Sequence, residues 1–123
     1  MRTAFTSILR RTVERVPGAI GAVFADWDGE AVDHVNVTRG PDTELLMIGA
    51  HYGVVLNHVQ SALHLFHFGE AEEIILQHAR MDLVLRAVRR GYFIILATAA
   101  GAHLATARRE VLAAASALAS EMD

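Results

Sequence analysis

The stretch that most restricts the fold is residues 92–99, YFIILATA, in which apolar side chains occupy consecutive positions. A strand with one face in water alternates apolar and polar residues, whereas a strand that is apolar on both faces must be covered on both. Helices packed on the two faces of a sheet provide that cover. The stretch therefore predicts the central strand of a sheet that lies between two layers of helices.

Three segments have the apolar spacing that is typical of helices: residues 3–16, 42–67 and 102–122. The first segment is stopped by Pro17-Gly18, and the last is rich in Ala, a strong helix former. Asp42 or Thr43 is expected to cap the long middle helix, because short polar side chains accept hydrogen bonds from the first backbone N–H groups of a helix. These segments predict the helical layers.

Four further segments have strand character: residues 19–25, 31–37, 72–79 and 82–88. The Asp-Gly turn in ADWDGEA, residues 25–31, joins the first two, and Arg89-Arg90-Gly91 joins the fourth to the apolar strand. The order is α-β-β-α-β-β-β-α, and strands joined by short turns pair antiparallel. We therefore expect one domain over residues 1–123 of the α/β (α+β) class, a three-layer α/β/α sandwich around a five-stranded antiparallel sheet.

Composition excludes several classes of function. A net charge of −3 argues against a general nucleic-acid or anionic-membrane binder. The chain has no Lys, which excludes a phosphate-binding P-loop and Schiff-base chemistry, and no Cys, which excludes thiolate catalysis and disulfides. Arginines at positions 10, 11 and 15 come too early for the apolar core of a signal peptide, and no apolar run reaches the length of a membrane span. We expect a cytoplasmic protein that does not insert into membranes.

Acidic residues in the first turn resemble calcium ligands only superficially. Asp26, Asp28 and Glu30 alternate as the first ligands of a calcium loop do, but such a loop requires Gly at its sixth position and Glu at its twelfth. This chain has Ala31 and Val37 there. The acidic side chains are therefore expected to stabilise the turn.

Neither a metal site nor a hydrolase is supported. On the long helix His51 and His58 project together, whereas His64 and His67 project to roughly the opposite side, and the HExxH motif is absent. The serines lie in predicted helices without the GxSxG motif of a nucleophile. The prediction is that the protein is not an enzyme and has no catalytic, cofactor-binding or metal-binding residue; a pH-sensitive interface at His51 or His58 stays open as an alternative.

The most informative features of the sequence point to association with another protein chain. The long helix has two apolar stripes. The broad one is expected to lie on the sheet and contains Leu45, Ile48, Tyr52, Val55, Leu56, Val59, Leu63 and Phe66. The narrow one has the spacing of a helix–helix seam and contains Met47, Ala50, Val54, Ser61 and Leu65, with His58 beside it.

The strand at residues 72–79 is expected at an edge of the sheet, where Ile74, Ile75 and Leu76 would leave an apolar template for another strand. A two-fold axis through this strand and the narrow stripe would pair edge with edge and helix with helix. The predicted homodimer interface therefore comprises Met47, Ala50, Val54, His58, Ser61, Leu65, Ile74 and Leu76. The alternative is that the stripe covers part of its own fold.

Trp27, the only Trp, stands at the tip of the first hairpin. It either folds back over a neighbouring helix or offers a rigid anchor to a partner, and we favour the anchor. Asp26, Trp27, Asp28 and His51 are the candidate partner-binding residues.

Two stretches carry a resemblance to a known family. VPGAIGAVFADWDGEAVD, residues 16–33, is similar to a helix end, Gly turn, first strand and Asp-Gly hairpin, and RRGYFIILATAAGAHLATARREVLAAASAL, residues 89–118, to a final strand and C-terminal helix. With the long helix between them, the sequence resembles the roadblock/dynein light chain family, in particular its small bacterial gliding-motility regulators of the MglB and MglC type.

The resemblance implies a homodimer whose sheets join through residues 72–79 into one ten-stranded sheet, with the long helices side by side on one face. It also implies a platform for a Ras-like small GTPase or for other roadblock proteins, and some members accelerate GTP hydrolysis. This chain departs from the pattern: its long helix is apolar and His-rich rather than charged, and it ends at Asp123 without the extension that some members use.

The leading hypothesis is therefore a cytoplasmic, homodimeric, non-catalytic adaptor or scaffold that regulates a Ras-like small GTPase or its roadblock partner in cell polarity or gliding motility. The alternatives are a GTPase-activating protein and, third, a small-ligand sensor domain.

Overall fold

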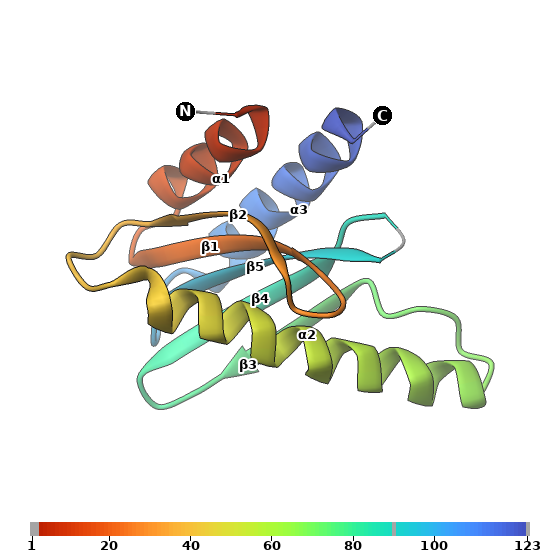
Figure 1. Ribbon diagram of the computed structural model, residues 1–123. Coiled ribbons are helices and arrows are strands. Elements are labelled where there is room, and N and C mark those ends of the chain that lie inside the picture. Colours follow the sequence, from red (N-terminus) through yellow and green to blue (C-terminus); the bar gives the residue numbers. More distant parts are fainter. Residues whose placement is uncertain (1–2, 90, 123) are drawn as a thin grey trace.

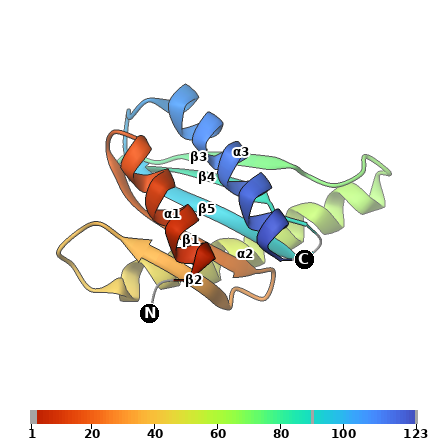
Figure 2. The same ribbon diagram turned by 90° about the horizontal axis from the view of Figure 1, so that it is seen from above.

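A computed structural model describes residues 3–89 and 91–122 of the chain. The elements are α1 (Ala4–Arg15), β1 (Ala19–Asp26), β2 (Ala31–Asn36), α2 (Asp42–Leu65), β3 (Glu73–Gln77), β4 (Met81–Ala87), β5 (Tyr92–Ala99) and α3 (Leu104–Glu121). The strands form one antiparallel sheet in the order β2-β1-β5-β4-β3. Helices α1 and α3 lie side by side on one face of the sheet and α2 lies on the other (Figures 1 and 2). The predicted element order and the three-layer α/β/α architecture are confirmed.

Strand β5 is the centre of the sheet, as its apolar sequence predicts. It pairs with β1 on one side and with β4 on the other, and its residues 93–98 are all buried. Its side chains alternate between two cores: Ile94 and Leu96 pack in the cluster with α1 and α3, whereas Phe93 and Ile95 pack in the cluster with α2. The strand is apolar at consecutive positions because both of its faces are covered.

The first turn of α1 is fixed to the edge strand β2. Thr3 caps the helix by accepting a hydrogen bond from the backbone N–H of Thr6, and the Thr6 hydroxyl closes a capping box. The hydroxyls of Thr3 and Thr6 also donate to the Asp33 carboxylate on β2. This contact ties the start of α1 to the sheet.

Helix α2 begins differently from the prediction. Its N-cap is Pro41, no side chain caps it, and Asp42 is its first residue, so the capping role expected of Asp42 or Thr43 is wrong. The Asp42 carboxylate instead lies against His34 and Asn36 of β2. The carboxylate forms hydrogen bonds with side chains of β2 because the loop after β2 brings the start of α2 back over that strand.

The far end of α2 extends past the sheet. In both views the C-terminal end of the helix, with the connection that follows it, projects beyond the strands (Figures 1 and 2). Helix α2 ends at Leu65, two residues before the predicted end. Leu45 and Leu56 of the broad stripe are buried as predicted, but Phe66 is 62% exposed. The expectation that Phe66 lies on the sheet is wrong because Phe66 follows Leu65, the last residue of the helix, at the end that extends past the strands.

Strand β3 lies at an edge of the sheet, as predicted, but is shorter than residues 72–79. It ends at Gln77 because His78 begins the turn to β4, where its backbone N–H donates to the Met81 carbonyl at 2.9 Å. Before the strand, the Gln60 side chain holds both backbone groups of Ala71, at 2.7 and 3.1 Å. These two contacts fix the ends of the exposed edge.

A candidate partner-binding surface on helix α2 and strand β3

Small residues bring the buried face of α2 close to the sheet and the first hairpin. A Cβ at Gly49 would lie 2.9 Å from Val23 Cγ1 on β1, and a Cβ at Gly53 would lie 3.2 Å from backbone atoms of Gly29. Gly29 has φ +87, and a Cβ there would lie 2.7 Å from the backbone of Ala50. Glycine is required at the hairpin tip both for this conformation and for the close approach to α2.

The hairpin tip places Trp27 inward. Its side chain is half-buried and packs against the core beneath α2, and its backbone N–H donates to the Gly91 carbonyl at 3.0 Å. The Asp26 carboxylate accepts hydrogen bonds from the backbone N–H groups of Asp28 and Glu30, at 3.0 Å each. Asp26 therefore has the turn-forming role that its position suggests, and the fold-back alternative for Trp27 describes the indole better than a free anchor does.

The narrow stripe of α2 faces away from the sheet. Met47, Val54 and Leu65 are 65%, 50% and 74% exposed. The other predicted members, Ala50, His58 and Ser61, are exposed as well, as is the candidate partner residue His51. Buried residues such as Leu56 and Gln60 occupy the opposite side of the helix. We call the row of Met47, Val54, His58, Ser61 and Leu65 the outward ridge.

A second row runs along the side of α2 that faces β3 and β4. It comprises Ile48, Tyr52, Val55, Val59 and Leu63, spaced by threes and fours and all half-buried. The Tyr52 hydroxyl lies 3.1 Å from His78 Nε2 at the end of β3, which fixes the direction of this row. We call it the β3-facing flank; it is distinct from the outward ridge and from the side that touches Gly29.

Two hollows open along the first half of this flank. One, of about 430 Å³, lies between α2 and the β3–β4 turn and is lined by Glu44, Ile48, Tyr52, His78, Ala79, Arg80, Met81 and Leu83. The other, of about 520 Å³, adjoins it on the helix and is lined by Pro41, Thr43, Glu44, Met47, Ile48, His51 and Tyr52. They share Glu44, Ile48 and Tyr52, so we treat them as one groove. Its lining is mostly apolar with a polar rim.

The edge strand β3 combines apolar side chains with one strong ion pair. Ile74 and Leu76 point to the core beneath α2 and are half-buried. Glu73 accepts two hydrogen bonds from Arg108 Nε, at 3.1 and 3.2 Å, and one from its Nη2, at 2.8 Å. These bonds from Arg108 hold the pKa of the Glu73 carboxyl below its usual value. The ion pair fastens β3 to α3, while within the described chain the strand pairs with β4 alone.

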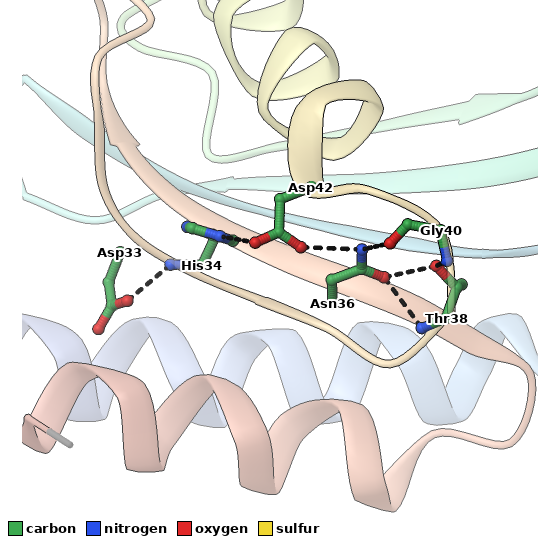
Figure 3. Close-up of polar contacts among 6 residues, drawn as sticks. All are labelled: Asp33, His34, Asn36, Thr38, Gly40 and Asp42. Atoms are coloured by element: carbon green, nitrogen blue, oxygen red, sulfur yellow. Dashed lines mark hydrogen bonds and ion pairs between the residues drawn. The ribbon is translucent and has the colours of Figure 1, made fainter. Parts of the chain in front are cut away.

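The opposite edge, β2, is covered by polar contacts (Figure 3). His34 Nε2 lies 2.9 Å from the Asp42 carboxylate, and Asn36 Nδ2 donates to Asp42 and to the Gly40 carbonyl, at 3.0 and 3.1 Å. Thr38 donates to the Asn36 side-chain oxygen through its N–H and its hydroxyl. The contacts from His34 and then Asn36 lower the pKa of Asp42. Polar and charged groups of this kind discourage strand pairing, so β3 is the better template for a further strand.

Two features of this surface escaped the sequence analysis. One is the split of the broad stripe of α2 into residues buried on the sheet, such as Leu56, and the half-buried β3-facing flank, which depends on where the sheet lies. The other is the exposed pair Phe66 and Phe68, whose rings stack with centroids 6.0 Å apart. The run LHLFHFG, residues 63–69, carried a signal for this pair, because two aromatic residues beside a glycine at the end of a helix are unusual on a surface that only contacts solvent.

Residues 3–89 and 91–122 contain no group of three or more His, Asp or Glu side chains placed to hold a metal ion. Over the same residues, every helix is too short or too polar to cross a membrane.

Comparison with known proteins shows which solved structures share this architecture. No model of a known protein family matches the sequence, and no curated protein matches it. Solved structures do. MglB of Myxococcus xanthus superposes with a TM-score of 0.86 at 14% identity, over 98% of this chain and 95% of that one. A Roadblock/LC7 domain from Streptomyces avermitilis gives 0.83 at 15% identity, over 94% and 95%. MglC of Myxococcus xanthus gives 0.71 at 20% identity, over 97% and 99%. The order of helices and strands, the sheet and these superpositions together establish that this chain has the roadblock fold.

Proposed function

We propose that this protein is a cytoplasmic, homodimeric, non-catalytic adaptor that regulates a Ras-like small GTPase or another roadblock protein in cell polarity or gliding motility. One observation carries the proposal: the edge of β3, which is open within the described residues, lies beside a half-buried apolar flank of α2. A second copy related by a two-fold axis at β3 offers the same two features in return. The solved MglB and MglC structures, which share the fold, supply the biological setting.

We place the contacts of the proposed dimer on the residues that lie beside β3. When two sheets join through β3, the partner's long helix lies on the same face of the joined sheet, so it meets α2 from the side. That side is the β3-facing flank, with Val55 at its middle. The predicted interface residues Ile74 and Leu76 keep their place on the joining strand, whereas the outward ridge at Met47, Val54 and Leu65 points away from the sheet.

The outward ridge is therefore the proposed surface for the regulated partner. Met47, Val54 and Leu65 form an exposed apolar row along the helix, with His58 beside it. Exposed apolar rows rimmed by polar residues are typical of protein interaction sites. In a dimer with paired α2 helices, two copies of the ridge lie next to each other and give a broad platform.

Two adjacent valines separate the two roles. Val55→Asp places a charge on the β3-facing flank, and Val54→Asp places the same charge on the outward ridge. We expect light scattering to give the wild type and Val54→Asp about twice the 13.4 kDa of one chain, and Val55→Asp the mass of one chain. Circular dichroism controls for folding. A wild type that keeps the mass of a single chain at every concentration would remove the proposal.

The partner is tested with the cognate Ras-like GTPase. We expect wild-type protein to bind it, Val54→Asp to lose binding while it stays dimeric, and single-turnover GTP hydrolysis to proceed at an unchanged rate. Faster hydrolysis would replace the scaffold role with the GTPase-activating alternative. Failure of the wild type to bind either the GTPase or another roadblock protein would refute the adaptor role.

A further inference from the structure

The groove lies beside the first half of α2 and is open to solvent. Ile48 and Tyr52 form its floor on the helix, and Met81 and Leu83 line it from the sheet. The rim carries Glu44, His51, His78 and Arg80. An apolar floor with a charged rim suits a large apolar side chain that enters from outside.

The other end of the same helix carries side chains of that kind. Phe66 and Phe68 are 62% and 76% exposed. Phe66 follows Leu63 by three residues, so it continues the β3-facing flank past the end of the sheet. We call Phe66 and Phe68 the aromatic tip.

The aromatic tip is held in place before any partner binds. The backbone N–H of Phe68 donates to the Leu63 carbonyl at 3.0 Å, and that of Phe66 to the Ala62 carbonyl at 3.3 Å. Gln60 closes the connection by bonding both backbone groups of Ala71. A preorganised projection loses little conformational entropy on binding.

Two contacts show which residues of α2 lie opposite β3. Tyr52 touches His78 after the strand, and Gln60 holds Ala71 before it. Helix and strand therefore run antiparallel, and the middle of β3 is level with about residue 56 of α2, midway between the two contacts at 1.5 Å per residue. A two-fold axis at the middle of β3 then brings Phe66 of one copy level with about residue 46 of the other, beside the groove.

We infer that each copy inserts its aromatic tip into the groove of the other copy, an inference that rests on the proposed homodimer and assigns the occupant of the groove. The groove and the tip lie at about equal distances from the axis along the helix, so one rotation brings each tip level with the groove of the other copy. With about 200 Å² for each Phe side chain, the exposed part of the two rings is about 280 Å² per copy. Both tips and the groove surface they cover then bury roughly 1,000 Å², the size that a specific interface needs, before the strands are counted.

Cysteine cross-linking tests the exchange, because the chain has no Cys of its own. Ile48→Cys and Ala62→Cys are made as separate variants and mixed under mild oxidation. In the inferred arrangement residue 48 of one copy lies level with about residue 64 of the other, while two residues 48, or two residues 62, lie roughly 20 Å apart along the helices. We expect a covalent dimer from the mixture and none from either variant alone. Self-linking of either variant, with no excess of the mixed product, would overturn the inference.

Neighbouring residues provide a matched pair for affinity. Phe66→Ala/Phe68→Ala removes the tip, whereas Leu65→Ala removes an equally exposed apolar side chain from the outward ridge. Dilution monitored by sedimentation should show a dimer dissociation constant raised at least tenfold by the first change and less than threefold by the second. Equal effects, or none, in a protein that is still dimeric would refute the tip exchange and leave the proposed adaptor intact. A monomeric wild type would refute both.

Discussion

The contact between the first hairpin and α2 yields the sharpest prediction about stability. Gly29 and Gly101 both have positive φ, at +87 and +79. They differ in their surroundings: a Cβ at Gly29 would lie 2.7 Å from the Cα and the carbonyl oxygen of Ala50, whereas a Cβ at Gly101 would meet nothing within 4 Å. Replacing each by Ala imposes the same backbone strain, so the difference between the two variants isolates the contact with α2.

The magnitudes follow from these distances. Left-handed backbone costs an L-residue about 1–2 kcal/mol, and the stiffer unfolded chain returns about 0.4–1 kcal/mol, so Gly101→Ala should cost about 1 kcal/mol. At Gly29 the new methyl group meets helix backbone, which has no rotamer to change, and forced overpacking costs about 1–3 kcal/mol more. Gly29→Ala should therefore lower the free energy of unfolding by about 2–4 kcal/mol.

The assay is urea unfolding at one fixed protein concentration, because the proposed dimer would make apparent stability depend on concentration. The slope of unfolding free energy against urea should stay constant, so that the midpoints report stability alone. The reasoning is refuted if Gly29→Ala and Gly101→Ala differ by less than about 0.5 kcal/mol, since the hairpin would then not be pressed against the helix.

Three further changes test other contacts. Gln60→Met keeps the length of the side chain but removes both bonds to Ala71, so urea unfolding should show a loss of about 2 kcal/mol, and no loss would mean that the connection is not held there. The hydrogen bond with His34 lowers the pKa of Asp42, so the ionised carboxylate stabilises the fold above the usual pKa of an aspartate, and this stabilisation disappears as pH falls through the lowered pKa. Urea midpoints measured between about pH 5 and 3 should therefore fall less for Asp42→Asn than for the wild type. Parallel curves for the two proteins would contradict the contact. Trp27→Ala should cost about 2 kcal/mol because the indole is half-buried, whereas Trp27→Phe should cost less than about 1, since the indole Nε1 is buried without a hydrogen-bond partner in the described chain; a free anchor at the tip would show no loss in either variant.

The sequence by itself determined the elements and the layers of this protein. Apolar side chains at consecutive positions of 92–99 require cover on both faces, which places that strand at the centre of the sheet. Helical spacing and the Pro17-Gly18 and Asp-Gly turns marked the ends of most elements to within one or two residues. Strand 72–79 was also placed correctly at an edge. These features are local, since spacing and turn chemistry act over a few residues.

Tertiary structure alone decided which apolar residues are exposed and which are covered. Periodicity separated Val54 from the side of α2 that lies on the sheet, but only the position of the sheet decides that Val55 is half-buried towards β3 and not buried beneath the helix. Phe66 has the spacing of the core-facing residues of α2 but is exposed, because the end of the helix extends past the sheet. Asp42 has the chemistry of a helix cap and bonds a strand instead, because the loop brings His34 within reach. Trp27 turns inward because Gly29 lets the hairpin rest on α2. Each outcome depends on contacts between residues distant along the chain, and neither propensity nor spacing encodes those distances.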